Sequence, residues 1–183
     1  MRELILLFIF YAFNLQSKAQ IKAREEIIFD SLLKIKQNCI GKKITSFNTI
    51  TLKGEKFSNK SLFGKITFVN FWFESCAPCI NEIPYLNLLY RRYSNNKQFQ
   101  LIAFTTDYPD KAQKAKDKYK IRYPVLPISN KDCQDLMCLN GFPTNMIIDD
   151  KGIIIFLHIG GFLDIQDFKK MVYPKVDSLL KNK

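Results

Sequence analysis

Two cysteines separated by two residues carry the clearest chemical signal in this chain. The motif Cys76-Ala77-Pro78-Cys79 follows an apolar run at 66–72 and precedes a helix-like run. A helix start has unpaired N–H groups and about half a positive charge. Both stabilise a thiolate, which is the nucleophile in disulfide exchange. Pro78 suits the first helical turn, where its missing N–H costs little. The spacing therefore predicts a dithiol redox centre.

Alternating strand and helix patterns predict the elements that would position this motif. Residues 66–71 and 98–105 are short apolar runs typical of central strands. We expect further strands at 124–127, a hairpin of 44–52 with 56–57, and a second hairpin of 146–149 with 153–158. We expect helices from the motif to about 93, with Pro84 inside it, and at 108–120, 131–139 and 164–180, the last capped by Asp164. This order predicts an α/β fold with a mixed sheet.

The composition indicates one folded domain with extensions. The chain has 183 residues, of which 47% are hydrophobic and 14% aromatic, enough for a substantial core. The formal charge is +11, but the lysines are scattered and form no arginine-rich stripe. This pattern argues against a nucleic-acid site and favours a basic surface suited to acidic partners or peripheral contact with anionic membranes.

The N-terminus has the pattern of an export signal. A short charged start and an apolar run at 4–13 precede Ser17-Lys18-Ala19, which offers small residues for cleavage after Ala19. We therefore expect a signal peptide at 1–19, a helical lead-in at 20–40, a domain at 41–183, and an exported, periplasmic protein. The alternative is an uncleaved segment that tethers the protein to the membrane, although the run is shorter than the roughly 20 residues of a spanning helix.

Three cysteines lie outside the motif, namely Cys39, Cys133 and Cys138. Two of them could pair and leave one free thiol, or all three could be buried and inert; spacing alone leaves both alternatives open. A bridge between Cys133 and Cys138 is disfavoured if both lie on one helix. The rise of about 1.5 Å per residue would hold their Cα atoms farther apart than the ~7 Å that a disulfide spans.

The chain resembles the thioredoxin-like superfamily, and within it the TlpA/ResA-type exported thiol-disulfide oxidoreductases. The resemblance covers residues 41–181 and is carried by 64–72, the Cys76–Cys79 motif, Glu82-Ile83-Pro84 and the later segment 141–152. It implies a thioredoxin-like α/β fold, with a central mixed β-sheet flanked by helices and an N-terminal β-hairpin extension.

The resemblance also implies roles for individual residues. Cys76 would be the exposed attacking thiolate, and the more buried Cys79 would resolve the mixed disulfide. The pair would form the redox-active disulfide. Pro143 would be a cis-proline facing the pair, and together with Phe142 and Thr144 it would bind the substrate chain as a short β-bridge.

Glu82 is the expected proton carrier for Cys79. In this branch an acid at this position lies near the dithiol beneath the surface, and a partly buried carboxyl has a raised pKa. The alternative is a surface glutamate favoured by the helix dipole. Thioredoxins proper have a buried aspartate at the position of Asn70. An amide cannot titrate, so Glu82 becomes the stronger candidate for the proton-transfer role.

Two residues depart from the family pattern. Ser75 stands where relatives often have an aromatic residue, and Glu74 precedes it. A carboxylate close to Cys76 should oppose formation of the thiolate. Trp72 is expected to be a core residue that supports the site.

The leading hypothesis is an enzyme that reduces disulfides in client proteins, such as apocytochromes c, by attack from Cys76. The family implies a transmembrane thiol-electron donor, and we expect no cofactor and no metal. A Cu(I)-binding chaperone is the alternative, because thiolates suit that ion. Such chaperones usually have C-x-x-x-C and an added histidine, whereas His158, the single histidine here, is remote and expected to be structural. A peroxidase would need threonine at the position of Phe73.

Overall fold

The structure is a computed structural model that describes residues 18, 20–28, 30–31, 33–34, 38–138 and 141–181. The chain divides into two compact units, Met1–Asn38 and Cys39–Lys183. The described residues of 18–34 are helical and exposed, in keeping with the predicted helical lead-in. Most of the predicted signal peptide at 1–19, including its cleavage site, lies outside the described residues. Among the residues that are described, no helix is long and apolar enough to cross a membrane.

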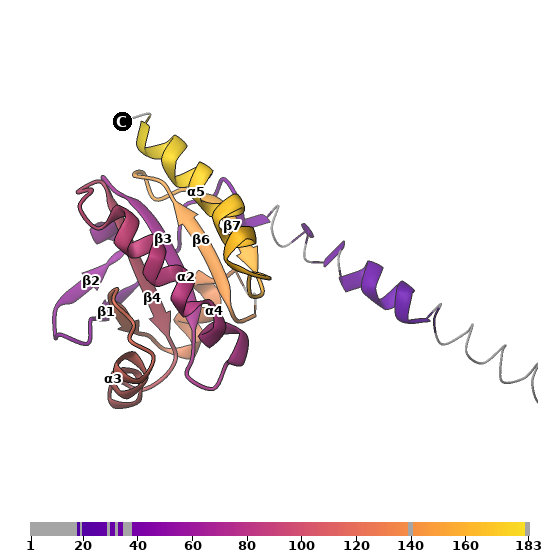
Figure 1. Ribbon diagram of the computed structural model, residues 1–183, viewed down its shortest axis with the longest axis horizontal. Helices are drawn as coiled ribbons and strands as arrows, with labels where there is room; N and C mark the ends of the chain where they lie inside the picture. The colour runs from indigo at the N-terminus through magenta and orange to yellow at the C-terminus, as the bar shows by residue number, and fades with distance from the viewer. Residues whose placement is uncertain are drawn as a thin grey trace, which may run out of the picture. The chain divides into compact units, whose positions relative to one another are not determined.

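A five-stranded mixed sheet forms the centre of the second unit, with the order β5-β4-β3-β6-β7 (Figure 1). Its middle strand, β3 (Ile66–Trp72), is buried along its whole length. It pairs in parallel with β4 (Phe99–Thr105) and antiparallel with β6 (Thr144–Ile148). The outer strands are β5 (Val125–Pro127), parallel to β4, and β7 (Ile154–Ile159), antiparallel to β6. The predicted mixed sheet is confirmed.

Helices flank this sheet and bring the cysteine motif to the end of β3. Helix α2 (Ala77–Tyr93) begins four residues after β3, and in Figure 1 it crosses the same face of the sheet as α5 (Ile165–Lys181). Both helices contribute apolar residues to one core cluster that includes Phe68, Leu86 and Phe168. Helix α3 (Pro109–Lys118) contacts β5, and the short α4 (Asn130–Leu136) precedes the loop into β6.

An antiparallel hairpin covers the edge of the sheet beside β5. It consists of β1 (Asn48–Ile50) and β2 (Lys56–Ser58), followed by the 3₁₀ helix η1 (Asn59–Leu62). The Leu52 N–H donates to the Val125 carbonyl at 3.4 Å, and the Thr49 hydroxyl donates to the Pro127 carbonyl. The predicted N-terminal hairpin is therefore confirmed, and it shields an edge strand that would otherwise present unpaired backbone groups.

Several element ends differ from the prediction for local reasons. The strand expected at 44–52 is paired only over Asn48–Ile50, because the Ile44 N–H bonds the Gly152 carbonyl on the other hairpin instead. The helix expected at 131–139 ends at Leu136, two residues before Cys138, which has a φ of 59°. The predicted cap at Asp164 is confirmed, since its carboxylate accepts from the N–H groups of residues 166 and 167.

Candidate active site

Cys76 and Cys79 form a disulfide at the start of α2, with Cα atoms 5.3 Å apart. Cys76 is the N-cap residue, and Pro78 occupies the first turn, where no backbone N–H is needed. The exposed fraction is 6% for Cys76 and 1% for Cys79. Cys76 is thus the more accessible residue of the two, but it is buried in the closed disulfide, whereas the resemblance implied an exposed position. The pair is placed where a helix terminus stabilises a thiolate once the bond opens.

Glu82 lies one turn beyond Cys79 and is buried, with 1% exposure. Its carboxylate accepts hydrogen bonds from two side-chain amides. Asn70 Nδ2 donates to Oε1 at 2.7 Å, and Asn145 Nδ2 donates to Oε2 at 3.0 Å. Asn70 Nδ2 also donates to Asn145 Oδ1 at 3.0 Å, which closes a three-residue network beneath the disulfide helix. The prediction that Glu82 lies beneath the surface is confirmed.

Burial sets the protonation of Glu82. Loss of hydration raises its pKa from 4.5 to about 8, against the opposing effect of the hydrogen bonds from Asn145 and Asn70. Neutral amides donate to the carboxylate but bring no positive charge. The carboxyl is therefore protonated at neutral pH yet close to its titration point, as a group that exchanges protons must be.

The loop before Cys76 is anchored to the end of β4. The Glu74 N–H donates to Asp107 Oδ2 at 2.6 Å, and Lys111 Nζ donates to Asp107 Oδ1 at 2.6 Å. Thr105 Oγ1 adds a bond to the same carboxylate at 3.3 Å. The Asp107 side chain is only 7% exposed, so these charge-assisted bonds hold the chain in place directly ahead of the nucleophile.

Lysines of α3 face the carboxylate of Glu74. Lys118 Nζ lies 3.2 Å from Oε1, and Lys111 Nζ lies 4.0 Å from Oε2. The pKa of Glu74 is lowered, chiefly by its hydrogen bond with Lys118. The sequence showed the acid but not these two cations, which offset part of its charge. The opposing effect of Glu74 on a Cys76 thiolate stays a prediction.

The loop from Gly141 to Thr144 leads into β6 and contacts the segment ahead of Cys76. The Phe142–Pro143 peptide is cis, as the resemblance implied. The Phe142 ring contacts Phe73 edge-on at 5.0 Å. Thr144 pairs with Phe71 in the sheet, and its hydroxyl donates to the Gly141 carbonyl at 2.6 Å. The fold therefore brings these predicted substrate-binding residues to the same end of the sheet as the dithiol.

A second close approach comes from the loop after β7. A Cβ on Gly161 would lie 3.5 Å from both the Cβ and the carbonyl oxygen of Pro78, so this backbone lies against the motif. Leu163, two residues further on, is 91% exposed. Together with the exposed Ala77 and Pro78 it leaves apolar surface close to the disulfide.

The structure supports the structural roles predicted for Trp72 and His158. Trp72 is 1% exposed and belongs to the main core cluster. The His158 ring stacks on Phe162 with centroids 4.2 Å apart. In the described part of the chain, no group of three or more His, Cys, Asp or Glu side chains is arranged to hold a metal ion.

The other cysteines form one further disulfide. Cys39 pairs with Cys138 across 99 positions, with Cα atoms 6.4 Å apart. Cys133 is free and buried, and burial raises the pKa of its thiol to about 12. This resolves the alternatives left open by spacing, because two of the three cysteines pair and the third is an inert core residue.

Sequence reasoning did not single out Asn145, Asp107 or Leu163. Asn145 is a polar residue within an apolar strand, and Asp107 lies two residues past the carboxyl end of β4. Both positions could have been noticed in the sequence. A buried amide such as that of Asn145 needs a hydrogen-bond partner, and functional groups such as Asp107 are common just past strand ends. Leu163 carries no such signal, since a single apolar residue in a loop is common.

Comparison with known proteins places this geometry in a family. The sequence profile of the AhpC/TSA family matches residues 40–157. The chain belongs to the AhpC/TSA family. Two similar members are the thiol-disulfide oxidoreductases ResA of Halalkalibacterium halodurans and Bacillus thuringiensis. The first is 28% identical over 138 residues, covering 74% of this chain and 78% of the relative. The second is 34% identical over 122 residues, covering 66% and 70%.

A solved structure supports the same assignment for this AhpC/TSA protein. The thioredoxin domain of a thiol-disulfide oxidoreductase from Bacteroides vulgatus matches with a TM-score of 0.66 and 27% identity, covering 75% of this chain and 98% of that one. The predicted thioredoxin-like fold is confirmed. The AhpC/TSA protein is a thiol-disulfide oxidoreductase of the ResA type whose redox pair is Cys76 and Cys79.

Proposed function

We propose that this protein is an exported reductase that transfers electrons to disulfides in client proteins. The observation that carries the proposal is the pairing of the Cys76–Cys79 disulfide at the start of α2 with the buried Glu82 on the same helix. The first feature supplies a nucleophile and its resolving thiol. The second supplies a group that takes up and releases a proton near neutral pH.

The proposed reaction starts from the reduced dithiol. The Cys76 thiolate attacks one sulfur of the client disulfide, the client S–S bond breaks, and the released client thiolate takes a proton from solvent. Cys79 then loses its proton and attacks the Cys76 sulfur, which frees the second client thiolate. That thiolate takes up a proton in turn, which balances the one that Cys79 loses. The client gains two electrons and two protons, and the protein is left with the Cys76–Cys79 disulfide that the structure contains.

Glu82 is proposed to carry the proton of the resolving step. Residues three apart on a helix are neighbours on one face, and Cys79 and Glu82 are both buried on α2. When the carboxyl is ionised, it can accept the Cys79 proton without that proton having to reach bulk water. Asn70 and Asn145 hold the carboxyl in place for this transfer.

Client binding is proposed for the loop at 142–144 and the apolar surface next to it. The backbone before Pro143 would pair with an extended client segment as a short β-bridge. The Phe142 ring, packed on Phe73, and the exposed Leu163 side chain would contact the client side chains. Thr144 would fix the loop through its bond to the Gly141 carbonyl.

We propose that the protein works outside the cytoplasm. The leader-like segment at 1–19 supports export, with cleavage after Ala19 or retention as a tether. The Cys39–Cys138 disulfide supports an oxidising compartment, because such bonds persist there. Apocytochromes c are the proposed clients and a transmembrane thiol carrier the proposed donor, both taken from the family resemblance.

A redox titration of the protein in thiol buffers, with alkylation to count thiols at each potential, tests the proposal. We expect a two-electron transition that disappears in Cys76→Ser, with a midpoint near the thioredoxin value of about −270 mV. A midpoint near about −120 mV would instead identify an oxidant. If no transition occurs at accessible potentials, the reductase proposal fails and Cu(I) binding by the same thiols becomes the hypothesis to test.

A further inference from the structure

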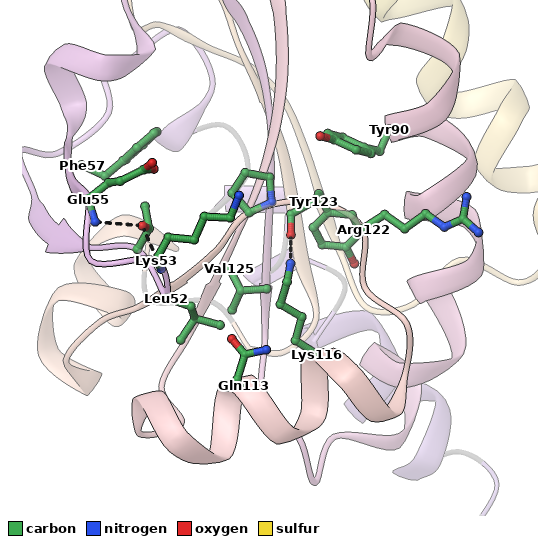
Figure 2. Close-up of a pocket in the computed structure, with 12 residues that line it drawn as sticks. Leu52, Lys53, Glu55, Phe57, Tyr90, Gln113, Lys116, Arg122, Tyr123 and Val125 are labelled. Atoms are coloured by element: carbon green, nitrogen blue, oxygen red, sulfur yellow. Dashed lines mark hydrogen bonds between the residues drawn. The ribbon is translucent and has the colours of Figure 1, made fainter.

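A pocket separate from the redox site lies between the hairpin turn, α3 and the residues that lead into β5 (Figure 2). We refer to it as the hairpin pocket. It encloses about 320 Å³, and its walls include Leu52 of the turn, Tyr90 of α2 and Val125 of β5. This volume is at the lower end of the range for pockets that hold small organic ligands. None of its lining residues belongs to the disulfide, the Glu82 network or the cis-proline loop.

Two lysines from different elements meet at this pocket. Lys116 comes from α3 and Lys53 from the hairpin turn, and Figure 2 shows both side chains extending into the space between these elements. Lys116 is half-buried, and its ammonium donates a 2.6 Å hydrogen bond to the Tyr123 carbonyl. Burial, followed by the charge of Lys53, lowers the pKa of Lys116. Two cations are therefore held close together beside apolar walls, and burial and the second charge oppose the charged state of Lys116.

No carboxylate in the described part of the chain lies within ion-pair distance of Lys53 or Lys116. Glu55 is the single acidic residue among those that line the pocket, and it pairs with neither lysine. Asp117, next to Lys116 in sequence, accepts a hydrogen bond from Gln113 at 2.9 Å. Asp117 favours the charged form of Lys116 through space, but within the described fold neither lysine has an ion-pair partner.

We propose that the hairpin pocket is a binding site for a small organic anion with a flat apolar body, such as an aromatic carboxylate or sulfonate. The anionic group would lie between Lys53 and Lys116, where a charge-assisted hydrogen bond to each ammonium replaces water. The apolar body would lie against Leu52, Tyr90 and Val125. The arrangement suits this class because apolar walls supply contact area while a few polar groups fix orientation.

The proposal is independent of the dithiol chemistry. Tyr123 lines the pocket, and its ring centroid lies 6.3 Å from that of Tyr90 on α2, the helix that begins at the disulfide. Binding is therefore expected in the oxidised protein, and equally in a Cys76→Ser/Cys79→Ser variant. A failure of the redox proposal would leave this test unchanged.

Two fluorescent probes with the same rings provide the experiment. 8-Anilinonaphthalene-1-sulfonate carries a negative charge, and N-phenyl-1-naphthylamine is its neutral counterpart. We expect the full chain to bind one sulfonate probe, at least about tenfold more tightly than the neutral probe, because charge-assisted hydrogen bonds exceed neutral contacts by that order. Amide chemical shifts should change at Gln113, Tyr123 and Val125.

Charge-removing variants separate the pocket from general basic surface. Lys116→Met should weaken binding of the sulfonate about tenfold. Lys114→Met removes the same charge from an exposed position of α3 outside the pocket and should leave binding unchanged. Lys53→Met serves as a second variant. Because Lys53 is exposed in the turn, its replacement should leave the fold intact, and weaker binding would then reflect the lost charge.

Three results would overturn the proposal. Equal affinity for the two probes would show that charge plays no part. Equal weakening by Lys114→Met and Lys116→Met would assign binding to the overall positive charge. Chemical-shift changes centred on Phe142 and Leu163 would place the probe on the apolar surface beside the disulfide instead.

Discussion

The side-chain amide of Asn70 donates a 2.7 Å hydrogen bond to Glu82, joining the central strand of the sheet to the helix that carries the dithiol. Asn145 on β6 donates to the same carboxylate at 3.0 Å. A carboxyl so buried and bonded only to neutral amides has no counter-charge, which is why its pKa rises to about 8. Strand β3, which leads into the cysteine motif, and its neighbour β6 thus hold the carboxyl in its buried position.

Glu82→Gln should slow disulfide exchange. Loss of the proton acceptor is expected to reduce the rate of the resolving step about 100-fold, within the usual contribution of general acid–base groups. Stopped-flow measurements with a disulfide peptide should show an inflection near pH 8 in the unmodified protein and none in the variant.

The matched control for this substitution is Glu55→Gln, which removes an exposed carboxylate from the hairpin turn. Its rate and pH profile should match those of the unmodified protein. If Glu82→Gln keeps the inflection, the titrating group is another residue.

Stability should depend on pH through the same carboxyl. Its pKa is raised from 4.5 to about 8, so the folded state holds the proton more tightly than the unfolded chain. The resulting stabilisation is fully present below about pH 4.5 and is lost as pH rises through about 8, by a total on the order of a few kcal/mol. Urea unfolding of the oxidised protein at a series of pH values measures this loss. Glu82→Gln should lack this pH-dependent loss of stability. Parallel plots of unfolding free energy against pH for the two proteins would contradict the raised pKa of Glu82.

Asn70→Asp should disturb the site more than a neutral replacement would. A second carboxyl within hydrogen-bond distance of Glu82 makes it unfavourable to ionise both. We expect the inflection in the pH profile of the exchange rate to split in two or to move to higher pH. The free energy of unfolding should fall as pH rises past about 5. Asn70→Ala removes the amide without adding charge and is the comparison. Identical pH profiles for the two variants would argue against coupling between positions 70 and 82.

Asp107→Asn should loosen the loop ahead of Cys76. The substitution replaces a 7% exposed carboxylate that receives bonds from the Glu74 N–H and from Lys111. We expect a loss of about 1–3 kcal/mol in the free energy of unfolding and a shift in the redox midpoint of the dithiol. Asp110→Asn, on the exposed first turn of α3, should change stability by about 0.5 kcal/mol or less. An unchanged midpoint in Asp107→Asn would limit this residue to a structural role.

The Cys39–Cys138 disulfide should stabilise the fold independently of the redox pair. The bridge spans 99 positions, and a closed loop of that length contributes about 4–5 kcal/mol in the chain-entropy account. Cys39→Ser/Cys138→Ser should lower stability by that order and leave the midpoint of Cys76 and Cys79 in place. Alkylation of the oxidised, denatured protein should label one thiol, at Cys133, and none in Cys133→Ala. Labelling of three thiols would contradict the pairing.

Much of the fold was predictable because its signals are local. The strand before the motif, the helix after it and the hairpin at the sheet edge each follow from the types and spacing of neighbouring residues. The same holds for the Cys76–Cys79 pair, whose function depends on a separation of three positions and on a helix start. Element ends were less predictable, since Ile44 bonds a distant hairpin rather than its own strand partner.

The amino-acid sequence by itself determined the chemistry of the dithiol, and the tertiary structure decided what surrounds it. Register between β3 and β6 places Asn70 opposite Asn145, 75 positions away, and so builds the Glu82 network. The packing of α3 brings Lys118 to Glu74 and offsets a charge that, in sequence alone, opposes the thiolate. Such contacts depend on sheet register and helix packing over the whole domain, which local patterns do not encode.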